Sequence, residues 1–334
     1  MICIYCGREL ARLEFSREHV IPEAFGLFEQ NLVLRDLVCR DCNQYFGNTI
    51  DLVLARGSIE ALDRLRHGLK PGSEATDLRR DRVQLTWAGS GEWHGVIMQF
   101  AVDPEGLAVQ LIPQVRFARR DERAYVFIPL ELLEDPNYQV TPETNTSGGM
   151  LLLVDSDATQ ERLIAALKAR GVDFNKKNDV ALPIQPGQQL PMEITVTIDS
   201  QLKRCIAKIS FNYLASTEWR DLVLHQDLTA TRRFIRYGER APFTVVRMGS
   251  KPILLGDSDN WRQTNGHILT VNWPANSHEV IGQVSLFNQA RYLVCLSPNL
   301  HAVWRDIRSG HLFDIERREI TRLGNVAGLV LPRQ

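Results

Sequence analysis

Hydrophobic and polar positions along the chain follow periods that predict both helices and strands. Apolar residues recur at helical spacing from Phe46 to Leu54, which predicts a helix that begins near residue 42 and runs toward residue 66. A second helix is expected over 158–170, where Gly171 suits the position after its end. A third, amphipathic helix is expected over 201–215. Its apolar face would contain Leu202, Cys205, Ile206, Ile209, Tyr213 and Leu214.

Short alternating or apolar runs predict strands in much of the remaining chain. The runs are 82–87, 96–100, 108–112, 150–155, 194–198 and 267–273. Residues 71–80 hold Pro and Gly among polar residues, which indicates a linker. We therefore expect an α+β chain, with a small N-terminal domain over 1–70 and a larger mixed α/β or β-rich domain over 81–334.

Composition and charge exclude several classes of protein. With 44% hydrophobic and 24% charged residues among 334, the chain has ordinary globular composition. No segment approaches the ~20 apolar residues of a membrane span, and the N-terminus lacks the pattern of a secretory signal. A cytoplasmic location without membrane contact is therefore expected. The net charge of −1 argues against binding nucleic acid over the whole surface, so such contact needs a local patch.

Four of the six cysteines form two C-x2-C pairs, Cys3 with Cys6 and Cys39 with Cys42. Paired thiols at this spacing are typical of a tetrahedral structural Zn²⁺ site. Four buried free thiols are the alternative. The other two cysteines, Cys205 and Cys295, lie in apolar runs and are expected in the core.

Between the two pairs the chain reads Glu18-His19-Val20-Ile21-Pro22, and the second pair continues directly into Asn43. This order of C-x2-C, E-H-V-I-P and C-x2-C-N resembles the zinc-knuckle branch of the HNH endonuclease family, over about residues 1–55. The resemblance implies a ββα-metal fold, in which two strands and a helix surround one divalent ion. It also implies cleavage that leaves 5′-phosphate and 3′-hydroxyl ends.

The residue types agree with that chemistry. Hydrolysis of a phosphodiester needs a base that activates water and a cation that stabilises the leaving oxygen. His19 is the only histidine in the first 66 residues, and Glu18 beside it is a hard oxygen donor suited to Mg²⁺ or Mn²⁺. Strand neighbours point to opposite faces, so a shared site needs a bend, which Pro22 and Gly26 could supply. A surface Glu-His pair in a turn is the alternative.

The resemblance implies a role for each candidate residue: Glu18 and Asn43 hold the ion, and His19 is the general base. Asn43 could instead cap the helix that follows. Two positions depart from the family pattern. Glu18 stands where Asp is more common, and the family's middle Asn, which orients the histidine, falls on Leu34. The nearest asparagine is Asn31, and a backbone carbonyl could serve instead.

Basic residues follow the predicted helix and are candidates for contact with the DNA backbone. They are Arg56, Arg64, Arg66 and Lys70. Most such clusters are simply solvated. The later histidines, at positions 225, 267, 278, 301 and 311, lack the spacing of metal ligands and are expected to be structural.

The sequence thus predicts a metal-dependent HNH-type endonuclease that acts on DNA, with RNA left open. It would carry structural Zn²⁺ and catalytic Mg²⁺ or Mn²⁺. The C-terminal region would select substrate, bind a protein partner, form a homo-oligomer or regulate the nuclease, as in restriction or anti-phage systems. The alternative is a non-catalytic zinc module that binds nucleic acid or protein.

Overall fold

The structure is a computed structural model, and it combines helices and strands in two compact units. It describes residues 1–29, 32–69, 82–89, 91–103, 106–118, 125–140, 149–173, 188–217, 220–241, 246–249, 266–274, 277–301 and 307–323. The first unit joins Met1–Pro71 to Ile198–Gln334, and the second is Gly72–Thr197. Within the described residues, no helix has the length and apolarity that a membrane crossing requires.

The N-terminal segment of the first unit is a hairpin followed by helices. Strands β1 (Phe15–His19) and β2 (Val33–Cys39) pair antiparallel. Three helices follow, α1 (Arg40–Asn48), α2 (Ile50–Gly57) and α3 (Ile59–Arg66). The prediction of a single helix that runs toward residue 66 is therefore wrong. The backbone leaves the helical conformation at Thr49 and again at Ser58, whose hydroxyl accepts the Ala61 N–H and starts α3.

The C-terminal segment of this unit supplies a six-stranded antiparallel sheet in the order β10-β13-β12-β11-β14-β15. Its strands are β10 (Val246–Gly249), β11 (Gly266–Trp273), β12 (Val280–Leu286), β13 (Ala290–Ser297), β14 (Ile307–Asp314) and β15 (Glu319–Arg322). Helices α6 (Ser200–Thr217), α7 (Arg220–Val223) and α8 (Thr229–Tyr237) precede it. The strand expected over 267–273 is confirmed as β11.

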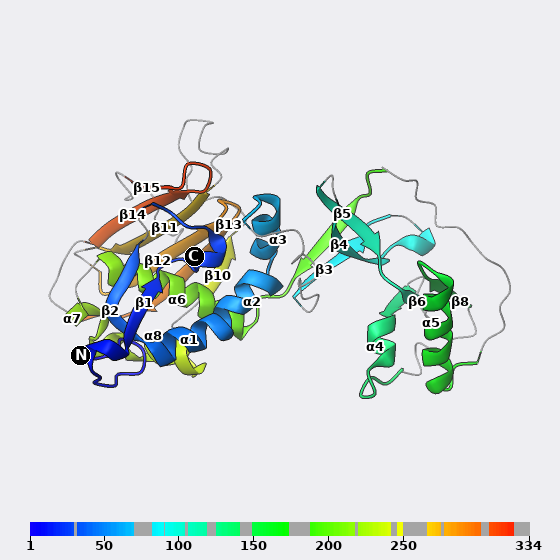
Figure 1. The fold of residues 1–334 in the computed structure, drawn as a ribbon, viewed down its shortest axis with the longest axis horizontal. Coiled ribbons are helices and arrows are strands. Elements are labelled where there is room, and N and C mark those ends of the chain that lie inside the picture. The colour runs from blue at the N-terminus through cyan, green and yellow to red at the C-terminus, as the bar shows by residue number, and fades with distance from the viewer. Residues whose placement is uncertain are drawn as a thin grey trace. The chain divides into compact units, whose positions relative to one another are not determined.

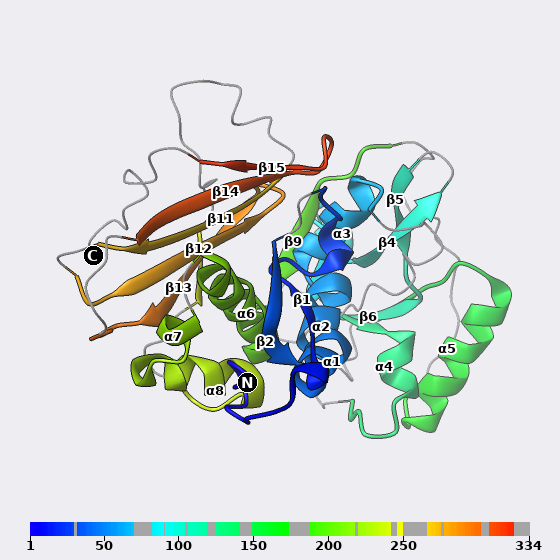
Figure 2. The ribbon, with the colours of Figure 1, turned by 60° about the vertical axis from the view of Figure 1, so that its left-hand side comes forward.

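Helix α6 is the centre of the first unit. One side packs on strands β11, β12 and β13, and the other packs on α2 and β2 (Figures 1 and 2). The six residues of the expected apolar face are all buried, as predicted. The opposite face is not exposed, however. Lys208 and Asn212 on α6 are also at most 1% exposed, because residues of the N-terminal segment contact them.

This packing changes the expected division of the chain. Residues 81–334 were expected to form one domain, but 198–334 share a hydrophobic core with the N-terminal segment. That core joins Phe46, Ile50 and Leu54 to residues of α6 and of the six-stranded sheet. The second unit is therefore an insertion between α3 and α6, and its beginning at Gly72 falls within the predicted linker.

The second unit contains two sheets, β5-β4-β3-β9 and β7-β6-β8. The strands are β3 (Val83–Trp87), β4 (Ile97–Asp103), β5 (Gly106–Leu111), β6 (Gln114–Ala118), β7 (Tyr125–Pro129), β8 (Met150–Leu153) and β9 (Met192–Val196). Helix α4 (Leu130–Glu134) and the predicted helix, α5 (Asp157–Ala169), accompany the second sheet. Gly171 has φ +72°, the left-handed conformation expected after a helix end.

His267 on β11 connects the sheet to the N-terminal segment. Its ring is fully buried, Nε2 donates to the Phe25 carbonyl at 2.8 Å, and Nδ1 accepts the Phe287 N–H at 3.1 Å. Both nitrogens of a neutral imidazole are thus used, which confirms the expected structural role. Burial lowers the pKa of His267 to about 4.

Acid should therefore destabilise the first unit through His267. In the unfolded chain this imidazole takes up a proton near pH 6.5, whereas in the folded chain it does so only near pH 4. The unfolded state binds more protons in that window, so the free energy of unfolding should fall by about 2 kcal/mol between about pH 7 and about pH 5. Urea unfolding at the two pH values measures this, and His267→Gln should remove that part of the pH dependence. An unchanged dependence in the variant would contradict the assignment.

Candidate functional site

The four paired cysteines come together in the structure, as predicted. Cys3 and Cys6 lie in the N-terminal turn, Cys39 ends β2, and Cys42 lies in the first turn of α1. Their sulfur atoms are all within 4.8 Å of one another, and Cys6 Sγ lies 3.8 Å from Cys39 Sγ. Zn–S bonds of ~2.3 Å in a tetrahedron separate the sulfurs by about 3.8 Å. The donor set and its spacing therefore fit Zn²⁺.

Arg8 accompanies this cluster, which the sequence did not indicate. Its guanidinium donates to Cys6 Sγ at 3.5 Å and to Cys39 Sγ at 3.9 Å, and it pairs with Asp41 at 2.6 Å. A cation beside the sulfurs favours the thiolate form that binds metal.

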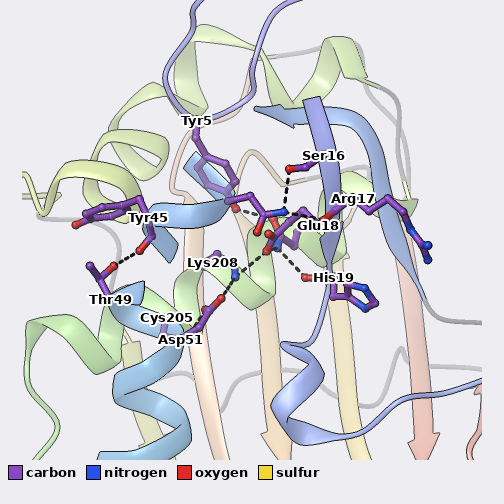
Figure 3. Close-up of polar contacts among 12 residues, drawn as sticks. Tyr5, Ser16, Arg17, Glu18, His19, Tyr45, Thr49, Asp51, Cys205 and Lys208 are labelled. Carbon is purple, nitrogen blue, oxygen red and sulfur yellow. Dashed lines mark hydrogen bonds and ion pairs between the residues drawn. The ribbon is translucent and has the colours of Figure 1, made fainter. Parts of the chain in front are cut away.

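Strand β1 presents Glu18 and His19 in different surroundings. The Glu18 side chain is 4% exposed and points toward α6, whereas the His19 side chain is 17% exposed and its ring points away from Glu18 (Figure 3). This is the expected alternation of neighbours on a strand. A bend follows, as predicted: the short 3₁₀ helix η2 (Glu23–Phe25) begins after Pro22, and Gly26 has φ +124°.

The bend brings Glu23 back to His19. Glu23 Oε1 lies 2.8 Å from His19 Nε2. Burial lowers the pKa of His19, Glu23 opposes that shift, and Arg17 and Lys208 add to it. The imidazole is thus kept neutral near neutral pH and is held through one nitrogen. The sequence assigned the orienting role to Asn31 or a carbonyl and missed Glu23, although its spacing of four residues from His19 across a turn was a usable signal.

Asn31 lies outside the described residues. The pairing of β1 with β2 is irregular. Ser16 pairs with Val38 and Glu18 pairs with Leu34, so β2 contains two more residues than β1 in this stretch. Asp36, inside it, has φ +58°.

Asn43 lies within α1 and not at its N-cap, which is Cys39, so the capping alternative is wrong. Its amide nitrogen donates to Ser16 Oγ at 2.9 Å and to the Arg17 carbonyl at 2.7 Å. These bonds connect α1 to β1 and use the nitrogen, so the amide oxygen is the atom that Asn43 could offer to a cation.

Glu18 contacts two residues of α6 that the sequence did not suggest. Lys208 Nζ lies 2.7 Å from Glu18 Oε1, and Asn212 Nδ2 donates to the same oxygen at 3.0 Å. Lys208 also pairs with Asp51 of α2 at 2.5 Å (Figure 3). Burial raises the pKa of Glu18, and the Lys208 ammonium opposes that shift. Both residues lie outside the apolar face predicted for this amphipathic helix, so the sequence contained no signal of their burial.

A pocket of about 510 Å³ collects these groups. It is lined by Arg17, Glu18, His19, Pro22, Glu23, Ala24, Asn43, Gly47, Asp51, Leu52, Ala55 and Lys208. Every lining residue belongs to the first unit. The structure thus brings Glu18, His19 and Asn43 to one cavity, and it adds the exposed Arg17 at the edge.

The basic residues after α1 divide into different environments. Arg64 is 6% exposed and donates to the carbonyls of Ala24 and Ala55, so its predicted contact with DNA is wrong: its donors hold the backbone together. Arg66 is half exposed and pairs with Asp63. Arg56 is partly buried, and Lys70 lies outside the described residues.

The comparisons with known proteins agree with this arrangement. The HNH endonuclease family model matches residues 3–57, the segment that holds the cysteine cluster, Glu18, His19 and Asn43. No curated protein and no solved structure shows a significant match to the chain. The family of the N-terminal segment indicates nuclease activity in general, and it implies binding to nucleic acid.

Proposed function

We propose that this chain, whose residues 3–57 match the HNH endonuclease family, hydrolyses phosphodiester bonds in DNA with the help of a divalent cation. One observation carries the proposal: Glu18, His19 and Asn43 line one pocket in the segment that matches the family. A role in restriction or anti-phage defence stays a prediction from the sequence.

The donor set at this pocket fits a hard cation such as Mg²⁺ or Mn²⁺. Among the described residues, the donors that reach the Glu18 carboxylate bind Oε1, so Oε2 remains for a cation. Asn43 would add its amide oxygen. When bound, the cation would stabilise negative charge on the departing 3′-oxygen.

His19 would act as the general base. With Nε2 held by Glu23, Nδ1 is the nitrogen that can take a proton from water. Its lowered pKa keeps the ring neutral, which is the form that accepts a proton, near neutral pH. Arg17, which lines the pocket and is exposed, would contact the phosphate backbone. Arg66 is not among the residues that line the pocket, and its contact with DNA stays a prediction from the sequence.

The second candidate is a zinc module that binds nucleic acid or protein without cleavage. It is favoured by the ion pair between Lys208 and Glu18, since this ammonium already uses one oxygen of the proposed ligand. Metal stoichiometry separates the two. A nuclease should bind one tight Zn²⁺ and a second, weaker ion, whereas a zinc module should bind only the first.

We expect purified protein with Mn²⁺ to nick or linearise plasmid DNA, and we expect EDTA to stop the reaction, because the cation is required for hydrolysis. Gel electrophoresis of plasmid, single-stranded DNA and RNA after incubation measures both activity and substrate. Cleavage of RNA alone would redirect the proposal to RNA. A zinc-loaded protein that cleaves none of the three would favour the binding module.

A further inference from the structure

Helix α6 contributes polar groups to the candidate site across almost two hundred residues of sequence. Lys208 and Asn212 lie four positions apart, on the side of the helix that faces β1 and α2. Asn212 also receives a hydrogen bond from Tyr5 at 2.6 Å and donates to the His19 carbonyl at 3.2 Å. Asn212 thus contacts both the proposed metal ligand, Glu18, and the residue after it, His19, from a helix far along the chain.

Lys208 is a fixed cation in this arrangement. Its side chain is 1% exposed, and the ammonium lies between the Glu18 and Asp51 carboxylates (Figure 3). The ammonium also lies 5.2 Å from the centre of the Phe46 ring. Separating a buried ammonium from two carboxylates would leave three uncompensated charges, which is strongly unfavourable. Lys208 is therefore a permanent part of the site and not a side chain that swings out.

The Asp51 and Glu18 carboxylates differ in how many of their oxygens have a partner. Asp51 engages both of its oxygens, Oδ2 with Lys208 and Oδ1 with the Cys205 thiol at 3.4 Å. Glu18 receives Lys208 and Asn212 on the single oxygen Oε1. The ammonium thus balances the charge of Asp51 and, with Asn212, holds Oε1 of Glu18, which leaves Oε2 as the oxygen that Glu18 can offer in the pocket it lines with Asn43 and His19.

We propose that Lys208, with Asn212, is a positioning residue of the nuclease site: it fixes the Glu18 carboxylate and prevents a divalent cation from binding between Glu18 and Asp51. The inference rests on the proposed function. It implies that the first 71 residues do not form the complete site, because the group that orients the metal ligand comes from α6.

The test compares Lys208→Met with the wild-type full chain loaded with zinc. Two quantities are measured: the Mn²⁺ dissociation constant, from the free-ion electron paramagnetic resonance signal, and the plasmid cleavage rate at saturating Mn²⁺. Without the ammonium, Glu18 and Asp51 should attract Mn²⁺ roughly tenfold more tightly or better. The ion would sit between them and away from the productive position, so the cleavage rate should fall at least about tenfold.

Matched variants exclude simpler explanations. Lys203→Met makes the same substitution on the same helix and should leave both quantities unchanged. Lys208→Arg keeps the charge and should recover part of the rate. The double variant Lys208→Met/Asp51→Asn restores the net charge of the site and should fold even where the single variant does not. Its Mn²⁺ affinity should return to about that of wild type, while cleavage stays at least about tenfold slow because Glu18 is no longer held.

Three results would overturn the inference. Unchanged affinity and rate in folded Lys208→Met would make Lys208 merely structural. Tighter Mn²⁺ with faster cleavage would make it a block on the metal site. A double variant that cleaves at the wild-type rate would show that Lys208 only balances the charge of Asp51 and does not position Glu18. Failure of the proposed function is a different observation, since the wild-type protein itself would then neither cleave nor bind a second ion.

Discussion

Replacing His19 by alanine should lower the rate of phosphodiester cleavage by roughly 10²–10⁴-fold, the usual effect of losing a general base. The expectation follows from geometry: His19 is the imidazole that lines the pocket, Glu23 holds its Nε2, and its lowered pKa keeps it able to accept a proton. Zinc content should stay at the wild-type level, because the ring contacts none of the four cysteines. Cleavage assays and zinc analysis of the same preparation check both statements.

Two variants serve as controls for this experiment. Asn43→Ala should also lower the rate, by weakening the cation, and additional Mn²⁺ should partly restore it. Extra metal should not rescue His19→Ala, because the lost function is proton transfer. His301→Ala removes an exposed imidazole of the same unit and should be silent. Cleavage by His19→Ala at the wild-type rate near neutral pH would exclude the proposed mechanism and favour the zinc module.

Serine at Cys39 or Cys42 should release zinc and unfold the whole first unit. Binding of structural zinc contributes on the order of 10 kcal/mol to the folding of small zinc domains. Cys3, Cys39 and Cys42 belong to the same buried core as α6 and the six-stranded sheet, so the loss should not stay within the N-terminal segment. Zinc analysis and hydrogen exchange of intact protein measure the two effects.

The second unit is the internal reference for that experiment. It has hydrophobic clusters of its own, around Val115 and Leu163 and around Leu85 and Met98, so its amides should stay protected. Cys295→Ser, in β13 and outside the sulfur cluster, should retain zinc. Full zinc content in Cys39→Ser or Cys42→Ser would show that the four cysteines do not form one site.

The elements that the sequence predicted well are those with local causes. In the second unit, the predicted runs overlap β3, β4, β5, β8 and β9 but not β6 or β7. Helix α5 follows from its periodicity and from Gly171. The cysteine cluster also followed from spacing, because two C-x2-C pairs are typical of a four-cysteine zinc site. The break between α1 and α2 escaped because Phe46, Ile50 and Leu54 keep helical spacing across Thr49.

What the sequence could not predict depends on contacts between distant parts of the chain. Lys208 and Asn212 resemble the solvent-facing positions of an amphipathic helix, and only the packing of α6 against α2 and β2 shows that they are buried. Arg64 was misjudged for the same reason, because its donors reach the carbonyl of Ala24, forty positions earlier. The insertion of the second unit could not be predicted either, because nothing in the sequence of residues 198–217 indicates that α6 packs against the N-terminal segment.

The separation between Glu18 and Asn212, 194 positions, also sets a time order on the ribosome. Synthesis at roughly 5–20 residues per second needs on the order of 10–40 s to cover that distance. Throughout that interval the emerging N-terminal segment has its cysteines and His19 but not the helix that orients Glu18. A nascent chain at this stage therefore lacks one of the residues that contact Glu18 in the proposed site.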